Sequence, residues 1–140
     1  MECKAIKNFK DCEAMSLFYN DDTNKYLGFE KKSPTQIDKL FSTPNWYGFI
    51  VSDNNKPVGV FNLRVSQSGF EAEFGIVVGY KFQGKGYGNE IMDLLEEEAK
   101  KLNISVIKLH VFEKNIKAIN LYNKKNYKEK HKEIIMEKIL

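Results

Sequence analysis

The sequence contains only two cysteines among its 140 residues, Cys3 and Cys12. They show neither the CxxC spacing nor the Cys/His pattern of a redox or metal site, so we expect no disulfide and no bound metal. No apolar run approaches the roughly 18 residues that a membrane-spanning helix needs. Met1 is followed by charged residues rather than by the apolar core of a secretory signal. A cytoplasmic protein without membrane contact is therefore expected.

The chain also lacks a strong excess of charge of one sign. Its net charge of +3 results from 22 basic and 19 acidic side chains, and the lysine-rich stretch 124–138 is interleaved with glutamates. Such mixing is more typical of a solvated face than of a nucleic-acid-binding surface, so no nucleic-acid partner is expected. A basic interaction domain built on this stretch is kept as an alternative. Repeats and linkers are absent, which predicts a single domain over residues 1–140.

Local signals predict two helices in the first third of the chain. A short strand is expected at residues 4–6, followed by a helix that Asp11 caps and that runs to about Tyr19. The run from Ser33 to Gln36 is a capping box with Pro34 at the first helical position, which predicts the start of the second helix.

The remainder predicts a mixed sheet. Strands are expected over residues 47–51, 58–65, 71–78 and 104–112, with helices after the glycines at 84, 86 and 88 and from Asn115 to Lys125. Two short strands, 127–131 and 133–139, would close the sheet. This order is typical of an α/β (α+β mixed-sheet) fold in which an antiparallel meander precedes a parallel β-α-β unit with helices on both faces.

The junction from Val78 to Asn89 carries the main functional signal. A predicted strand ends there and an amphipathic helix begins, with glycines at alternate positions between them. Glycines let backbone N–H groups approach an anion closely, and a helix N-terminus adds about half a positive charge. The pattern therefore predicts a site for a phosphate or pyrophosphate.

Two other phosphate motifs fit this junction poorly. The dinucleotide pattern GxGxxG would need a glycine at position 89, which is Asn89. A P-loop beginning at Gly79 would place Gly86 where a serine or threonine must hold magnesium, so nucleotide hydrolysis is not expected.

Gln83, Gly86 and Gly88 match the motif Q/R-x-x-G-x-G/A that follows a central strand in the GCN5-related N-acetyltransferase (GNAT) family, and the sequence resembles that family. Asn115, with the residues that follow it on the predicted helix, resembles the family's second motif. Together the two motifs cover residues 71–127. The resemblance implies a GNAT-like acyl-CoA N-acyltransferase fold with acetyl-CoA as co-substrate, bound where two parallel strands separate.

The resemblance also implies which residues contact acetyl-CoA. The backbone of the central strand would bind the pantetheine arm, the turn would bind the pyrophosphate, and the residue before the last helix would either contact the cofactor or only cap that helix. These residues are Ile76, Val77, Val78, Gln83, Gly84, Lys85, Gly86, Tyr87, Gly88, Asn89 and Asn115.

For the chemistry, the resemblance implies that Tyr122 protonates the departing thiolate and that the N–H of Val78 donates to the thioester oxygen. A core position for Tyr122 is the alternative. Glu73 is the candidate base, directly or through ordered water, because a partly buried carboxylate can accept a proton near neutral pH. His110 has no identifiable partner in the sequence and is expected to be structural.

The acceptor is expected to be a primary amine on a small molecule, a protein or a peptide, attacked directly in a ternary complex. Little chain is left after Tyr127 to wall the acceptor site, so we expect the acceptor cleft to be either open or completed by a second subunit, as a homodimer. Aromatic residues near the N-terminus would either line a pocket or pack on the sheet: Phe18, Tyr19, Tyr26, Phe29, Trp46 and Tyr47. A non-catalytic coenzyme A sensor is the alternative function.

Overall fold

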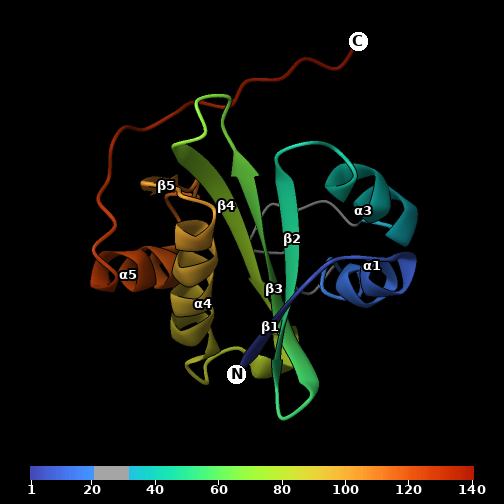
Figure 1. Ribbon diagram of the computed structural model, residues 1–140. Helices are drawn as coiled ribbons and strands as arrows, with labels where there is room; N and C mark the ends of the chain where they lie inside the picture. The colour runs from blue at the N-terminus through green and yellow to red at the C-terminus, as the bar shows by residue number, and fades with distance from the viewer. Residues whose placement is uncertain (21–31) are drawn as a thin grey trace.

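The computed structural model describes residues 1–20 and 32–140. Its centre is a five-stranded sheet in the order β1-β2-β3-β4-β5 (Figure 1). The strands are β1 (Glu2–Ala5), β2 (Trp46–Asp53), β3 (Lys56–Val65), β4 (Glu71–Val78) and β5 (Val106–Lys108). Neighbouring strands from β1 to β4 are antiparallel, and β5 runs parallel to β4. The predicted mixed sheet is confirmed.

Helices cover both faces of this sheet. Helices α1 (Phe9–Ser16) and α3 (Pro34–Phe41) lie on one side, while α4 (Tyr87–Lys101) and α5 (Ile116–Lys124) lie on the other (Figure 1). A single 3-10 turn, η1 (Tyr80–Phe82), joins β4 to α4. No helix in the described part of the chain is long and apolar enough to cross a membrane.

Local sequence accounts for several of these boundaries. Ser33 and Gln36 form both hydrogen bonds of the predicted capping box at the start of α3. The turn between β2 and β3 places Asn54 and Asn55 at φ values of 50° and 64°, a left-handed geometry that asparagine tolerates and a tight hairpin requires. The predicted capping box is confirmed, and the hairpin is part of the predicted antiparallel meander.

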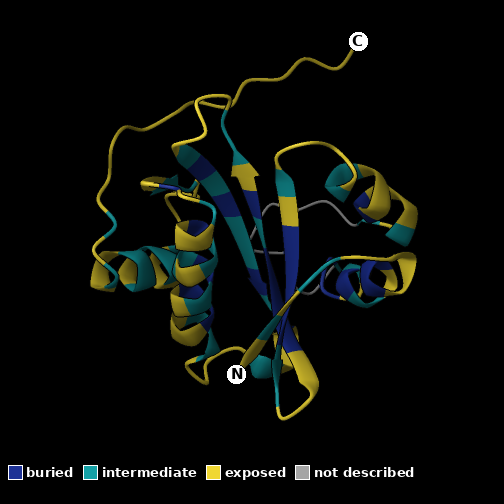
Figure 2. Cartoon of the chain, viewed as in Figure 1, coloured by how far each residue is buried: buried dark blue, intermediate teal, exposed yellow. Residues whose placement is uncertain are grey.

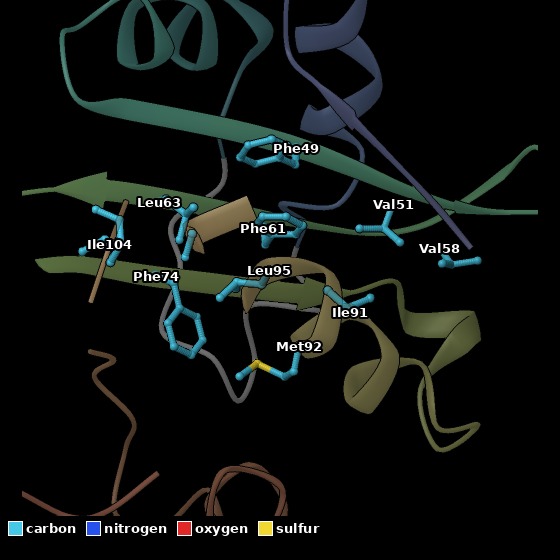
Figure 3. Close-up of a cluster of buried hydrophobic side chains, with 12 residues drawn as sticks. Phe49, Val51, Val58, Phe61, Leu63, Phe74, Ile91, Met92, Leu95 and Ile104 are labelled. Atoms are coloured by element: carbon cyan, nitrogen blue, oxygen red, sulfur yellow. The ribbon is translucent and has the colours of Figure 1, made fainter. Parts of the chain in front are cut away.

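The core has two apolar layers, one on each face of the sheet. The larger layer joins β2, β3 and β4 to α4 and includes Phe61, Leu63, Phe74, Ile91 and Leu95 (Figure 3). Figure 2 shows the buried residues concentrated on the sheet and on the faces of the helices that cover it. Full burial of each such side chain contributes about 1.5–3 kcal/mol. The pairing of β4 with α4 therefore fixes the strand and helix that flank the glycine-rich junction.

The smaller layer lies beneath α1 and α3. Phe18 and Tyr19 are buried there beside Met15, Ile37 and Val77, so the core interpretation of these two aromatic residues is confirmed. Trp46 and Tyr47 lie in β2. Tyr26 and Phe29 lie outside the described residues.

The start of α1 differs from the prediction. Asn8 caps the helix by accepting the N–H of Asp11, which therefore lies in the first turn rather than at the cap. The buried Asp11 carboxylate accepts hydrogen bonds from Lys4 Nζ and from the Lys7 N–H, each at 2.9 Å. Burial alone would raise the pKa of Asp11, but these two donors outweigh it and hold the pKa below its ordinary value.

The last third of the chain contains less sheet than predicted. The strand expected over 104–112 is reduced to Val106–Lys108, and the strands expected at 127–131 and 133–139 are absent, since residues 128–140 form neither helix nor strand. Only Lys132 separates the two expected strands, whereas a hairpin needs a connection of at least about two residues. The two halves therefore cannot pair with each other.

Candidate active site

The sheet opens between β4 and β5. The two strands pair only at their beginnings, where Glu71, Ala72 and Glu73 lie beside residues 106–108. Beyond Glu73, β4 continues to Val78 with no strand on this side in the described part of the chain. The second half of β4 therefore has an unpaired edge facing β5.

Alternation of the backbone identifies the groups on this edge. The Gly79 N–H donates to Val58 O at 2.9 Å, which directs the backbone of Gly79, and by alternation that of Val77, toward β3. The N–H and C=O groups of the intervening residues, Phe74, Ile76 and Val78, then point to the open edge. Two of the three strand residues expected to bind pantetheine thus direct backbone groups to the open edge, and Val77 does not.

The glycine-rich turn leaves the start of α4 without a side-chain cap. Gly86 is the N-cap residue, and no side chain accepts a hydrogen bond from the first turn of the helix. Gly86 and Gly84 have φ values of +85° and +77°, which favour glycine. A Cβ added to Gly86 would meet nothing within 4 Å. The first-turn N–H groups, which include those of Gly88 and Asn89, lack capping partners beside open space and fit a pyrophosphate.

Two of the predicted binding residues support the turn. The Gln83 side chain donates to Val78 O at 3.2 Å. The Tyr87 hydroxyl donates to Asp53 Oδ2 at 2.8 Å, and this hydrogen bond is the main cause of a raised Tyr87 pKa. Both contacts tie the turn to neighbouring strands, which indicates a supporting role in this conformation.

Close packing requires the third glycine of the motif. A Cβ on Gly88 would lie 3.2 Å from Leu121 Cδ2, closer than most real Cβ contacts. Gly88 therefore lets α5 approach the first turn of α4.

Two lysines bring positive charge to the turn. Lys85 is exposed within it. Lys117, on α5, places its Nζ 3.9 Å from the position of a Cβ on Gly84. Sequence analysis missed Lys117 because its proximity arises from the packing of α5 on α4, and only its place two residues after Asn115 could have suggested it.

Tyr122 lies beside the point where the strands separate. Its ring makes edge contacts with Phe74 of β4, at a centroid distance of 6.0 Å, and with Tyr127 at 5.9 Å. Burial raises the pKa of Tyr122 to about 12. Its hydroxyl has no hydrogen-bond partner among the described residues, whereas the Tyr127 hydroxyl donates to Glu96. The Tyr122 phenol is thus protonated at neutral pH and free to donate.

Two asparagines flank this aromatic cluster. Asn126 has a φ of 68°, a left-handed geometry that asparagine tolerates, directly before Tyr127. Asn115 caps α5 by accepting the N–H of Ala118 at 3.2 Å. The capping role of Asn115 is confirmed.

Glu73 belongs to a charged group on the opposite face of β4 from Phe74. Its carboxylate pairs with Arg64 and lies 3.4 Å from His110 Nε2. His110 Nδ1 lies 3.4 Å from Glu133, so His110 does have partners, contrary to the sequence-based expectation. Glu71 pairs with Lys108 at 2.9 Å, which lowers the pKa of Glu71. Arg64, Glu71, Glu73 and Lys108 line a hollow of about 270 Å³.

Comparison with known proteins identifies the family. The sequence model of the acetyltransferase (GNAT) family matches residues 13–127, which include the open edge of β4, the turn and Tyr122. The chain belongs to the GNAT acetyltransferase family. Members of this family are N-acetyltransferases that transfer the acetyl group of acetyl-CoA to amines, and this protein is such an enzyme. A search of curated proteins finds no match.

Solved structures share the GNAT fold over most of the chain. An aminoglycoside acetyltransferase from an uncultured soil metagenomic sample has 14% identity and a TM-score of 0.77, covering 99% of this chain and 95% of its own. Spermidine N-acetyltransferase from Vibrio cholerae, solved with CoA and spermine, has 25% identity and a TM-score of 0.74, covering 88% and 78%. A transcriptional regulator from Bacillus halodurans has 17% identity and a TM-score of 0.74, covering 97% and 99%. Proteins with such different names share this fold, so the fold alone does not identify the amine acceptor. The acceptor must be inferred from the site.

Proposed function

We propose that the protein acetylates a primary amine of a small molecule by direct attack within a ternary complex. The observation that carries this proposal is the unpaired edge of β4, which runs between an uncapped helix start and a protonated tyrosine without a partner among the described residues. A binding surface for an extended amide-containing arm thus connects an anion site to a proton donor.

Acetyl-CoA supplies the activated acetyl thioester, and the chain's own groups would hold it. The backbone groups that Ile76 and Val78 direct to the open edge suit the pantetheine amides, which would add to the sheet as a strand does, although the Val78 carbonyl already accepts a hydrogen bond from Gln83. The N–H groups of residues 84–89 suit the pyrophosphate, with Lys85 and Lys117 adding charge. Val77 is left out because its backbone is directed toward β3.

The position of Tyr122 refines which N–H stabilises the thioester oxygen. The Tyr122 ring contacts Phe74, four residues before Val78 in β4, so the ring lies toward the end of the edge that is far from the phosphate turn. Ile76 lies roughly 7 Å nearer to this end than Val78 does. We therefore assign the oxyanion donor to the Ile76 N–H in place of Val78.

Side chains on the two faces of β4 then carry out the two proton transfers. Glu73, which pairs with Arg64, accepts a proton from the attacking amine, directly or through water. As the carbon–sulfur bond breaks, Tyr122 donates its phenolic proton to the departing thiolate. The tyrosinate regains a proton from solvent, because burial holds the Tyr122 pKa near 12.

A small-molecule amine is the acceptor class that we propose. Structural relatives include enzymes named for aminoglycosides and spermidine. Their names support a small amine, rather than a peptide amino group, as the acceptor. The free thiols of Cys3 and Cys12 support a cytoplasmic protein. A single domain is supported by the one sheet that contains all five described strands. The exposed apolar residues near position 140 support a homodimer.

The test combines acetyl-CoA binding with turnover. Isothermal titration should show one-to-one micromolar binding, and an amine panel should reveal acetylation. We expect Tyr122→Phe to bind acetyl-CoA normally while kcat falls roughly 10²- to 10⁴-fold, because the proton donor is gone.

Tyr127→Phe is the matched control, since it removes a hydroxyl from the same aromatic cluster that is directed to Glu96. This control should retain kcat. If kcat fell equally in Tyr122→Phe and Tyr127→Phe, Tyr122 would be rejected as the proton donor. Tight binding without transfer to any amine would instead support the coenzyme A sensor.

A further inference from the structure

One hydrogen bond in the sheet joins a side chain of β3 to the backbone of β4. Asn62 lies opposite Gly75 in the antiparallel pair, and Asn62 Oδ1 accepts the Gly75 N–H at 2.7 Å. Gly75 directly precedes Ile76, whose N–H is the proposed donor to the thioester oxygen. A polar side chain is therefore bonded to β4 one residue from the proposed reaction centre.

This hydrogen bond also fixes the orientation of the Asn62 amide. A backbone N–H can only donate, so the amide atom that meets it is the oxygen. The amide nitrogen, Nδ2, then lies on the other branch of the side chain, and its two N–H groups have no partner among the described residues. Asn62 is half-buried. A ligand that covers it without accepting these N–H groups would leave them unpaired, which costs free energy.

Asn62 lies on the same face of the sheet as the proposed base. Side chains two residues apart in a strand point to the same face. Asn62 follows Val60 of β3 by two residues, and Val60 packs beneath α1 and α3. Glu73 precedes Val77 of β4 by four residues, and Val77 packs in the same layer. Asn62 and Glu73 therefore both face the side of the sheet that α1 and α3 cover (Figure 1).

Spacing along and across β4 places Asn62 beside the path of the acceptor. A strand rises about 3.3 Å per residue, so Gly75 is roughly 7 Å from Glu73 and about 3.3 Å from Ile76. The attacking amine must lie between this base and the thioester. Because Gly75 has no side chain, β4 presents only backbone between the Asn62 amide and the open edge. Neighbouring strands are about 4.8 Å apart, so an acceptor atom that meets Nδ2 lies only a few bonds from the amine nitrogen.

We propose that Asn62 selects the acceptor by donating a hydrogen bond from Nδ2 to one of its oxygen atoms. The preferred acceptor is then an amine with a hydroxyl or carbonyl oxygen a few bonds from its nitrogen, rather than a plain alkylamine. Sites that hydrogen-bond a polar group of the substrate discriminate strongly against analogues without that group. This inference rests on the proposed function, since the base and the thioester oxygen define where the amine lies.

Matched pairs of amines test this preference on the full chain. Each pair consists of an amino alcohol and the alkylamine in which a methyl group replaces the hydroxyl. Two such pairs are 2-aminoethanol with propylamine, and trans-2-aminocyclohexanol with trans-2-methylcyclohexylamine. A hydroxyl group also changes the basicity of the amine, so the decisive measurement is the ratio of the two kcat/KM values in the wild type compared with the same ratio in a variant.

Two variants separate recognition of the acceptor from support of β4. Asn62→Asp keeps an oxygen for the Gly75 N–H and removes the Nδ2 donors, so the ratio of amino alcohol to alkylamine should fall at least about tenfold. Asn62→Leu removes both contacts and should lower the ratio equally, with a loss of stability in urea denaturation. Asn123→Asp, at an exposed position of α5, adds the same charge and should keep the wild-type ratio. A wild-type ratio in Asn62→Asp would mean that Asn62 only holds β4, which overturns the proposal.

Binding without turnover separates this inference from the proposed function. Each amine is titrated into protein saturated with CoA, which carries no acetyl group. The amino alcohols should bind more tightly than their partners to the wild type, and this preference should be lost in Asn62→Asp. The preference without any acetylation would reject acetyl transfer and keep the role of Asn62. Acetylation without a preference that depends on Asn62 would reject the inference alone, and absence of both binding and acetylation would reject both.

Discussion

Helices α3 and α4 begin in opposite ways. At the start of α3, Ser33 accepts the Gln36 N–H at 3.2 Å and Gln36 accepts the Ser33 N–H at 2.8 Å, so side chains satisfy the helix start. At the start of α4, Gly86 offers no side chain and has a φ of +85°. The first arrangement satisfies its own donors, and the second leaves them for a ligand. A capped helix start here serves stability, and we propose that the uncapped one serves acetyl-CoA.

Adding a side chain at the uncapped start of α4 should have the largest effect, which is a loss of acetyl-CoA affinity. Gly86→Val adds a β-branched side chain at a positive φ, which strains the turn and fills space that the pyrophosphate needs. We expect acetyl-CoA affinity to fall at least about 100-fold, equivalent to roughly 3 kcal/mol. Isothermal titration measures this change.

Gly69→Val is the control for Gly86→Val, because it separates the effect of backbone strain from the loss of the pyrophosphate site. Gly69 has a φ of +78° and open space where a Cβ would lie, but it belongs to the loop between β3 and β4. This variant should lose comparable stability by urea denaturation and keep its acetyl-CoA affinity. If Gly69→Val lost as much affinity as Gly86→Val, backbone strain alone would account for the effect and the turn would not be the pyrophosphate site.

Removing the N-cap of α3 should have a smaller effect, and this effect should be on stability alone. Ser33→Ala removes the capping oxygen of α3 and should lower the free energy of unfolding by about 1 kcal/mol, with acetyl-CoA affinity unchanged. Urea denaturation with titration checks both values. Ser42→Ala, at the other end of α3, removes a hydroxyl that only donates to Asp38 O. If Ser42→Ala lowered the free energy of unfolding as much as Ser33→Ala, the capping hydrogen bond would not account for the effect.

Both helix starts could be predicted from the sequence because their signals are local. The capping box needs only residues 33–36, and the turn needs only the glycines beside a strand that ends at Val78. The left-handed positions of Asn54, Asn55 and Asn126 were equally accessible, since a turn demands them. The antiparallel meander followed from strand periodicity and these turns together.

The features that the sequence did not predict depend on contacts between distant segments. The partners of His110 come from β4 and from residue 133, and Lys117 reaches the turn only because α5 packs on α4. The cap of α1 is a different case, because Asn8, three residues before Asp11, is an equally good capping residue and takes that position. The pattern at 133–139 does favour a strand, but the described subunit offers it no hairpin partner.

Lys117 supplies the smallest predicted effect, and it tests how far the open start of α4 extends onto α5. Lys117→Met keeps an unbranched side chain that is one atom shorter and removes the charge near Gly84, so acetyl-CoA affinity should fall a few-fold, by about 0.5–1 kcal/mol at low salt. Raising the salt concentration should shrink this difference, because exposed charges are screened. Lys124→Met, on the last turn of the same helix, is the control and should leave the affinity unchanged. Equal losses in the two variants would show that Lys117 acts only through the overall charge of the protein, and the anion site would then be confined to the turn and the first residues of α4.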